Sequence, residues 1–405
     1  MRVNRRRFVG SMTVLGVGTM LGGARVWGGP SEGQLAFPEL RAAGTAGDVG
    51  LAHGNAFASQ IEYNLAFYRK WLSEYGNVPA ARLIEIARGF VPVIEERFPD
   101  MVEEMEGIAR GASLKLDEIV LINARTDILA IVEHEIQPEH IPGCTSLALF
   151  GEVEGKPALA LGQNWDWDPL MSKAPVVLRL EPDDAPPLVT LTEAGMLAKI
   201  GFNQHRLGVC LNFLSHLSDG QPGVFGIPIH CLLRAVLTCQ SIEQVVEVVE
   251  SSPRCASANF LVAQHDAGGP AALDLEITPN DVVTAGPDGS SLVHTNHFIS
   301  PSLAGGCTSG RGPSTMTRYA SAKLLSSIAE LEESDPVTRM EQVLVSREGL
   351  PYPISRDPDP DPSISTLAGI VMDLTGNRFI LTNGSPHENA WIERPGVEFK
   401  GGKRP

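Results

Sequence analysis

Apolar residues in the first third of the chain recur at the spacing of a helix. Over residues 51–135 they stand three and four positions apart, as in Phe57, Ile61 and Leu65. This is the period of an amphipathic helix. We therefore expect several helices here, with one of them beginning at about residue 116 and capped by Asp117.

After Cys144 the pattern changes to short apolar or alternating runs separated by Gly, Pro and Asp, which is typical of strands joined by turns. The expected strands are 145–150, 158–163, 176–180, 188–191, 207–213, 259–264, 271–277, 282–285, 292–295, 366–373 and 378–382. Helical runs interrupt them at 228–238, 242–249 and 315–331. Helices followed by strands with helical insertions predict an α+β fold of antiparallel sheets covered by helices.

Composition narrows the range of function classes. The chain has 405 residues, of which 43% are hydrophobic and 20% are charged, and this is ordinary for a folded protein. Its formal charge of −16 argues against a nucleic-acid partner. Six cysteines without a Cys-x-x-Cys pair argue against a zinc ribbon or a disulfide scaffold.

The start of the chain differs from the rest in charge. Residues 1–28 hold five arginines and no acid, with Arg5-Arg6-Arg7-Phe8 preceding a weakly apolar, Gly-rich stretch. This layout predicts a twin-arginine-type signal and export to the periplasm or the exterior, with no stable membrane span. The alternative is a disordered basic arm or a weak anchor. We expect residues 29–50 to form a linker.

Cys144 is the first candidate for chemistry, because it lies where an irregular acidic loop gives way to the first strand. Its thiol could attack the carbonyl group of Gly143, and a glycine has no Cβ to obstruct that approach. Cleavage of the bond between Gly143 and Cys144 would leave an α-amino group with a pKa of roughly 7.7–8.0 beside the thiol. One residue would then supply both nucleophile and base. The alternative is a small buried apolar cysteine.

The sequence Gly-Cys-Thr-Ser occurs again at Gly306-Cys307-Thr308-Ser309. This second copy precedes Gly310-Arg311-Gly312-Pro313 and lies in a loop that leads to a helix, with no strand to hold a nucleophile rigidly. Cys144 is therefore the better candidate. Cys210, Cys231, Cys239 and Cys255 lie in apolar patterns and are expected in the core.

The run Gln163-Asn164-Trp165-Asp166-Trp167-Asp168 follows the second expected strand. If residues 145–150 and 158–163 form a hairpin, its far end returns close to Cys144. Asp166 could then relay protons for the terminal amine, and Asn164 could donate a hydrogen bond. Two alternatives stay open, a cation held by Asp166 and Asp168 and a polar turn with two packed tryptophans.

The run His294-Thr295-Asn296-His297 stands at another strand end. His-x-x-His resembles a metal motif. On a strand, however, the two imidazoles would point to opposite faces, and no Glu or Cys completes the set, so we predict no metal and no cofactor. Asn296 is better suited to donate its amide hydrogen to an oxyanion. The histidines and glutamates of residues 133–140 are expected to keep that loop solvated.

Together these segments resemble the acyl-coenzyme A:6-aminopenicillanic acid acyltransferase family, which belongs to the N-terminal-nucleophile hydrolases. The likeness spans about residues 50–385. It also includes the stretches 50–54, 107–112, 121–127 (with Arg125), 192–195 and 201–203. The chain departs from the family pattern where Ser363 and its neighbours lack an expected arginine, while Arg356 matches a different arginine of that pattern.

The resemblance implies a four-layer αββα sandwich and a precursor that cleaves itself between Gly143 and Cys144. Cys144 would take the place of the nucleophile, Asp166 that of the aspartate beside its amine, and Asn296 that of the oxyanion asparagine. Asn164, Arg125 and Thr145 would support them. The helical chain 51–143 would remain bound to the chain 144–405 as a heterodimer.

We therefore expect an exported amidohydrolase or acyltransferase that acts on a small N-acyl amide through a thioester, with hydrolysis favoured because acyl-coenzyme A is a cytoplasmic metabolite. The alternative is a non-catalytic exported binding protein that retains the fold.

Overall fold

The computed structural model of the chain describes residues 20–21, 24–26, 36–132, 143–308, 312–357 and 364–398. Most of the expected signal segment, the acidic stretch 133–140 and Ser363 lie outside these ranges. In the part of the chain that is described, no helix combines the length and the apolar character needed to cross a membrane.

The N-terminal third is helical, as its periodicity predicts. The helices are α1 (Ala46–Tyr75), α2 (Ala80–Arg97), α3 (Pro99–Ala112), α4 (Leu116–Asn123) and α5 (Arg125–Val132). The expected cap at Asp117 is wrong. Helix α4 already begins at Leu116, because the Glu118 carboxylate accepts a hydrogen bond from the backbone N–H of Lys115 at 2.9 Å and thereby closes the first turn.

The expected linker 29–50 is also corrected. Its second half forms strand β3 (Glu39–Gly44) and the first turn of α1. Gly50, one of the glycines that suggested a linker, instead lets α1 and α3 approach closely, together with Gly111 of α3. A Cβ added at Gly50 would lie 2.0 Å from the carbonyl oxygen of Glu104, and one at Gly111 would lie 2.6 Å from the backbone nitrogen of Asn55.

Two sheets follow the helices. The larger has the strand order β1-β2-β3-β6-β7-β8-β9-β10-β11-β12, and the smaller has the order β13-β4-β5-β14-β15-β16. The strands of the larger sheet, besides β3, are β1 (Met20–Leu21), β2 (Ala24–Val26), β6 (Pro175–Pro182), β7 (Leu188–Glu193), β8 (Ile200–Asn203), β9 (Leu207–Phe213), β10 (Ala258–Asp266), β11 (Gly269–Ile277) and β12 (Val282–Ala285). Those of the smaller sheet are β4 (Thr145–Val153), β5 (Lys156–Trp167), β13 (Ser291–His294), β14 (Ser365–Asp373), β15 (Arg378–Leu381) and β16 (Ile392–Pro395). Neighbouring strands are antiparallel, except that β3 pairs with β6 in parallel.

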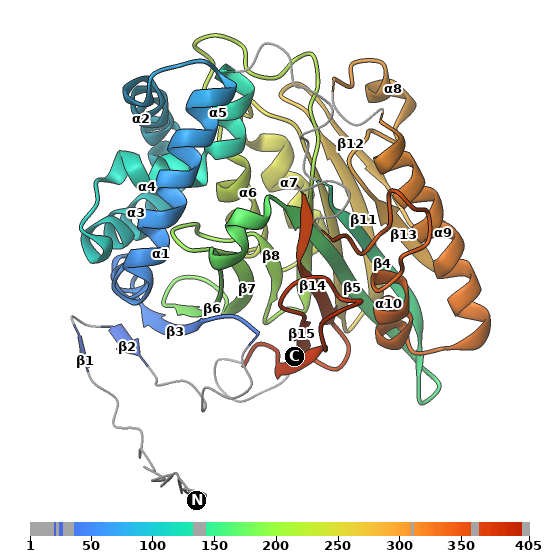
Figure 1. Cartoon of the computed structure of the whole chain (residues 1–405). Helices are drawn as coiled ribbons and strands as arrows, with labels where there is room; N and C mark the ends of the chain where they lie inside the picture. The colour runs from blue at the N-terminus through green and yellow to red at the C-terminus, as the bar shows by residue number, and fades with distance from the viewer. Residues whose placement is uncertain are drawn as a thin grey trace, which may run out of the picture.

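The remaining helices complete four layers. They are α6 (Ile229–Val236), α7 (Ile242–Ser251), α8 (Pro301–Ala304), α9 (Pro313–Glu332) and α10 (Pro336–Leu344), with a 3₁₀ turn η2 at Pro169–Lys173. Figure 1 shows α1 to α5 outside the larger sheet and α9 and α10 outside the smaller one. Strands β4 and β5 pack on β9 and β10 between these layers. The predicted α+β fold, a four-layer αββα sandwich, is confirmed.

The side chains of β4 alternate between two cores, and this alternation positions Cys144. Leu147 and Leu149 pack with Ala322 of α9 and Met340 of α10, whereas Ala148 belongs to the core between the sheets. A strand exposes every second residue on the same face. Cys144 therefore lies on the inter-sheet side, in line with Ala148, while Thr145 faces α9.

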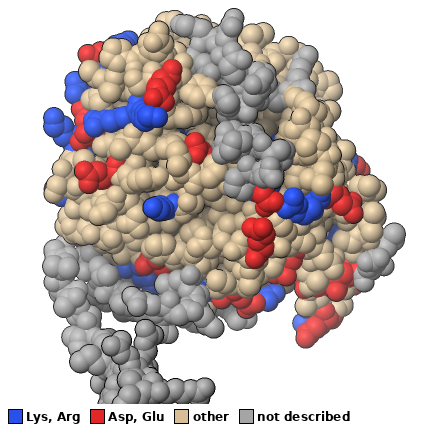
Figure 2. Space-filling model, in the orientation of Figure 1, with Lys and Arg blue, Asp and Glu red and all other residues tan. Residues whose placement is uncertain are grey.

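The expected hairpin is present. Strands β4 and β5 pair from Val153 and Lys156 at the turn to Thr145 and Asn164 at the open end. The segment after Asn164 therefore returns to Cys144. On the face of the molecule in Figure 2, Lys and Arg lie in small groups among acidic and uncharged residues rather than in one broad patch.

Candidate active site

Cys144 is positioned by a hydrogen bond of its backbone N–H as well as by its place directly before β4. Its side chain is buried, and its N–H donates a hydrogen bond of 2.8 Å to Oδ1 of Asn296. Its Sγ lies 3.9 Å from the carbonyl oxygen of Asp166. Burial, together with the Asp166 carboxylate, raises the pKa of the thiol above its ordinary value. In the uncut chain the protonated thiol is therefore the favoured form.

Arg318 of α9 connects the groups around Cys144. One terminal nitrogen, Nη1, donates to the carbonyl oxygen of Cys144 at 2.5 Å and to Oγ1 of Thr145 at 3.1 Å, while Nη2 donates to Oδ1 of Asn296 at 3.0 Å. Burial, with repulsion by Arg356, lowers the pKa of Arg318 to about 10, so it stays protonated at neutral pH. The planar guanidinium thus fixes the backbone of Cys144 relative to Asn296.

Asp166 lies on the other side of the bond between Gly143 and Cys144. Its Oδ1 accepts a hydrogen bond of 2.6 Å from the Thr366 hydroxyl, and its Oδ2 is buried without a hydrogen-bond partner, 3.9 Å from Nη1 of Arg356. Burial raises the pKa of Asp166 to about 6, although Arg356 and Arg318 oppose the shift. At neutral pH the carboxylate is therefore ionised, with one oxygen available to a new partner.

Gly143 lies directly against this group. A Cβ at residue 143 would stand 2.2 Å from Nη1 of Arg356 and 3.4 Å from Oδ2 of Asp166. No other residue fits without displacing the arginine. The glycine that the sequence favours for access to its carbonyl thus also leaves room for the Arg356 side chain.

Asn296 is turned toward the amide of Cys144 in the uncut chain. Its Oδ1 accepts from Cys144 and Arg318, and its Nδ2 donates to the carbonyl oxygen of Phe213 at 3.0 Å. A carboxamide nitrogen carries two protons. One proton on Nδ2 is therefore left for an oxyanion.

The three expected supporting residues lie in different places. Thr145 contacts Arg318, as described. Asn164 points away from Cys144 and donates to the carbonyl oxygens of Leu344 and Ile354 at 2.8 and 3.0 Å, because it follows the alternation of β5 onto the α10 side. Arg125 is the first residue of α5 and lines the pocket of Cys144.

That pocket is a small cavity of about 30 Å³ between the ends of the sheets. Its lining consists of Arg125, Thr126, Cys144, Trp165, Trp167, Lys199, Leu211, Phe213, Ile229, Ser257 and Ala258. The tryptophans of the expected polar turn therefore face the space between the sheets, while Asp166 between them faces the opposite side. Sequence reasoning missed Lys199, which follows the motif 192–195 in the loop between β7 and β8.

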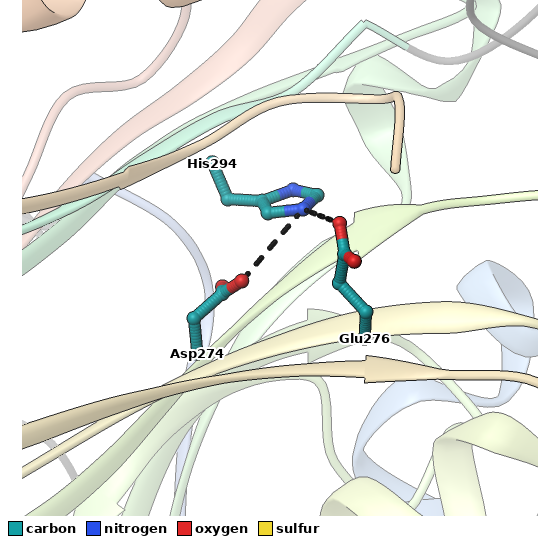
Figure 3. Close-up of side chains that lie close together, drawn as sticks. All are labelled: Asp274, Glu276 and His294. Atoms are coloured by element: carbon teal, nitrogen blue, oxygen red, sulfur yellow. Dashed lines mark hydrogen bonds and ion pairs between the residues drawn. The ribbon is translucent and has the colours of Figure 1, made fainter. Parts of the chain in front are cut away.

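His294, two residues before Asn296 in the chain, belongs to a buried ionic cluster (Figure 3). Nε2 of His294 is 3.0 Å from Oε1 of Glu276 and 3.8 Å from Oδ2 of Asp274, and its Nδ1 is 2.7 Å from the carbonyl oxygen of Thr295. Both ring nitrogens thus face acceptors. Burial lowers the pKa of His294, but the two carboxylates outweigh it and raise the pKa overall. A protonated imidazole satisfies this arrangement.

The expectation that His294 and His297 point to opposite faces is wrong. Strand β13 ends at His294, so the chain is no longer extended beyond it, and the two rings stack with centroids 6.4 Å apart. Asp274 and Glu276 supply the carboxylates that sequence reasoning did not bring to His294. The three ligand-type atoms lie within 4.8 Å of one another, but Glu276 also accepts from the N–H groups of Ile299 and Ser300.

Comparison with known proteins shows which family the chain belongs to. The family of acyl-coenzyme A:6-aminopenicillanic acid acyl-transferase matches residues 153–388. The acyl-coenzyme A:6-aminopenicillanic-acid-acyltransferase 40 kDa form of Emericella nidulans is 30% identical over 261 residues, which cover 63% of this chain and 68% of that protein. The chain belongs to the acyl-coenzyme A:6-aminopenicillanic acid acyl-transferase family. The resemblance inferred from the sequence is confirmed.

Three solved structures were also found similar to this member of the family. The Caenorhabditis elegans ortholog of N-acylethanolamine-hydrolyzing acid amidase has 14% identity and a TM-score of 0.40, covering 57% of this chain and 93% of that one. A mutant of conjugated bile acid hydrolase from Clostridium perfringens has 13% identity and a TM-score of 0.40, covering 62% and 95%. Penicillin V acylase from Agrobacterium tumefaciens has 17% identity and a TM-score of 0.38, covering 59% and 82%.

Membership of the family supports an enzyme that hydrolyses or transfers acyl groups of amides. Asp166, Asn296, Arg318 and Arg356 lie within the segment that the family matches, and Cys144 lies just before it. The family match therefore does not include Cys144 itself.

Proposed function

We propose that the protein is an exported, self-cleaving cysteine amidohydrolase in which Cys144 becomes an N-terminal nucleophile. The observation that carries this proposal is the enclosure of one peptide bond. On one side, Asn296 and Arg318 bind the backbone of Cys144. On the other, Gly143 lies against Arg356 and the unpartnered oxygen of Asp166. Burying two arginines and a carboxylate beside the first residue of a strand is costly, and pairing the strand does not require it.

Self-cleavage would begin with attack of Sγ of Cys144 on the carbonyl carbon of Gly143. The C–S bond forms, the C–N bond breaks, and the thiol proton passes to the departing nitrogen, which becomes the α-amine of Cys144. Water then hydrolyses the thioester, restores the thiol and leaves a carboxylate on Gly143. Asp166, ionised above a pKa of about 6, is placed to stabilise the new ammonium group.

The same groups would serve turnover. The α-amine of Cys144 takes the thiol proton while Sγ attacks the acyl carbon of the substrate, and the free proton on Nδ2 of Asn296 hydrogen-bonds to the developing oxyanion. Collapse breaks the C–N bond and transfers the proton to the leaving amine. Water then attacks the thioester, which releases a carboxylic acid and regenerates the thiol.

Hydrolysis is favoured over transfer because of the proposed route of export. The arginine-rich start of the chain has the layout of a twin-arginine signal. Outside the cytoplasm water is abundant, whereas acyl-coenzyme A is not available as a donor. The substrate would then be a small N-acyl amide, and the chain 51–143 would stay bound to the chain 144–405.

Denaturing mass spectrometry of the protein purified from periplasm and from cytoplasm tests this proposal. We expect the exported form to lack the N-terminal arginines and to contain a fragment that begins at Cys144. A single intact chain in a preparation that hydrolyses N-acyl amides would overturn self-cleavage. An intact N-terminus in the active fraction would overturn export.

A further inference from the structure

The wall of the Cys144 pocket contains two buried cations that share one carboxylate. Oε1 of Glu193 is 3.1 Å from Nη2 of Arg125 and 2.9 Å from Nζ of Lys199, and Oε2 accepts a hydrogen bond of 2.5 Å from the Tyr68 hydroxyl. Within the described ranges, Glu193 is the only carboxylate that forms an ion pair with either cation. This group therefore has one positive charge in excess.

The charge of each group at neutral pH follows from its burial and its ion pairs. Burial alone would raise the pKa of Glu193, but Arg125 and Lys199 outweigh it and lower the pKa to about 2, so Glu193 is ionised. Burial raises the pKa of Tyr68 well above its ordinary value, so its hydroxyl stays neutral. Burial lowers the pKa of Lys199 to about 8, which still leaves most of the lysine protonated at pH 7. Arg125 remains protonated throughout.

Both cations line the pocket, and Arg125 retains an unpartnered donor. The side chain of Lys199 is 3% exposed and that of Arg125 is 8% exposed, and both residues line the same cavity as Cys144. Nζ of Lys199 lies 3.5 Å from the ring centroid of Trp165. Nε of Arg125 is buried without a hydrogen-bond partner. An uncompensated buried charge is costly unless a partner of opposite sign arrives.

The loop between Glu193, at the end of β7, and Ile200 of β8 is bound to the helical layer by hydrogen bonds. Asn64 donates to the carbonyl oxygen of Ala194 at 2.7 Å, and Asn123 donates to that of Gly195 at 2.9 Å. Nε2 of His53 accepts from the N–H of Gly195 at 3.0 Å. The cation pair is therefore preorganised, which favours binding of a ligand of fixed geometry.

We propose that Arg125 and Lys199 form a binding subsite for a carboxylate, so that the substrates are N-acyl amides that carry a carboxylate close to the scissile bond. N-acyl amino acids are the simplest members of this class. Trp165 and Trp167 would contact the apolar part of the same substrate. The inference deepens the proposed function, on which the hydrolysis of these compounds rests, but binding of the carboxylate does not depend on cleavage.

Binding of N-benzoylglycine and of its uncharged analogue N-benzoylglycinamide to the full protein tests the subsite by calorimetry. We expect the acid to bind at least about tenfold more tightly than the amide. Lys199→Met should abolish this preference and Lys199→Arg should retain it.

Lys199→Met leaves Glu193 balanced by Arg125, so the fold should survive. Lys156→Met, at the exposed turn between β4 and β5, is the matched control and should keep the preference. Equal affinity of the wild type for both compounds would overturn the proposal.

Alkylation of Cys144 gives a second measure, with iodoacetate and iodoacetamide as a charged and a neutral reagent of similar shape. The rate with iodoacetate divided by the rate with iodoacetamide is measured at Cys144 on the peptide that contains it. This ratio should fall about tenfold in Lys199→Met and stay unchanged in Lys156→Met. If the two cations only tune the thiol, both rates will change together and the ratio will not, which contradicts a subsite. If Cys144 reacts with neither reagent and the chain is uncut, the proposed function fails, and the calorimetric preference still decides the subsite.

Discussion

The tetrapeptide Gly-Cys-Thr-Ser occurs at residues 143–146 and again at residues 306–309, and the two copies have different surroundings. Cys144 is 5% exposed and precedes a strand that is paired on both sides. Cys307 is half-buried, forms an isolated bridge with His216, and packs beside the small cluster of Leu214, Phe298 and Leu303.

The difference lies in what distant parts of the chain bring to each copy. At Cys144, Arg318 binds the carbonyl oxygen from a helix that is 174 positions away, and Asn296 binds the N–H. At the second copy, the N–H of Thr308 donates to the carbonyl oxygen of Ser215, and its hydroxyl meets that of Ser215. The same tetrapeptide is thus bound by side chains of Arg318 and Asn296 in one place and contacts a neighbouring loop in the other.

The largest expected effect comes from removing each thiol. Cys144→Ala should stay uncut and lose at least about 10³-fold in amide hydrolysis, since the thiol that would form the thioester is removed. Cys307→Ala should be cut and active like the wild type. Gel mobility and hydrolysis rates measure both. Cleavage of Cys144→Ala, or loss of cleavage in Cys307→Ala, would reverse the assignment.

Asp166→Asn should slow cleavage by roughly 10²-fold, because the carboxylate that stabilises the new ammonium group is lost. Because burial raises the pKa of Asp166 to about 6, the wild-type rate should increase as the pH rises through about 6, and the variant should lack this step. The folded state binds the Asp166 proton more tightly than the unfolded state does, because the pKa is raised from 3.8 to about 6. This proton binding stabilises the folded state at low pH, and the stabilisation is lost as the pH rises from 3.8 through about 6. The variant should therefore be no less stable at pH 7 in thermal unfolding. A slow variant that retains the pH step would argue against Asp166 as the titrating group.

Arg318→Lys should slow cleavage about ten- to 100-fold, because a single ammonium group cannot reach Cys144, Thr145 and Asn296 as the planar guanidinium does. The cleavage time course at constant pH measures this effect. Circular dichroism should show an unchanged fold, and thermal unfolding should remain cooperative. A lysine variant that is cut at the wild-type rate would show that the charge near Cys144 suffices.

The smallest effect should separate the two glycines. In Gly143→Ala the new Cβ would stand 2.2 Å from Nη1 of Arg356, so cleavage should slow by roughly tenfold as the arginine is displaced. In Gly306→Ala the new Cβ would stand 1.9 Å from Nε2 of His216, so stability should fall by about 1–3 kcal/mol while cleavage keeps its rate. Parallel cleavage and urea-unfolding curves check the pair. Equal slowing of cleavage in both variants would mean that overpacking alone explains the loss.

Much of the fold follows from local patterns. Three- and four-residue spacing predicted the helical third, and the paired runs 145–150 and 158–163 predicted the hairpin that returns Asp166 to the neighbourhood of Cys144. The errors occurred where local signals are ambiguous. Small residues at 39–50 suggest a linker, but they serve equally well in close helix packing. Strand β13 ends at His294, so the alternation of a strand does not continue to His297.

By itself, the sequence determined the order of elements, the family, the advantage of a glycine before Cys144 and the approach of Asp166, since each depends on neighbours in the chain or on one hairpin. Only the tertiary structure decided which cysteine is enclosed, that Arg318 links Cys144 to Asn296, and that Arg125 and Lys199 share Glu193 in the same pocket. These contacts join a helix of the first layer, a loop of the larger sheet and a helix beyond the smaller one. Their geometry is set by how the four layers pack, which no local period in the sequence records.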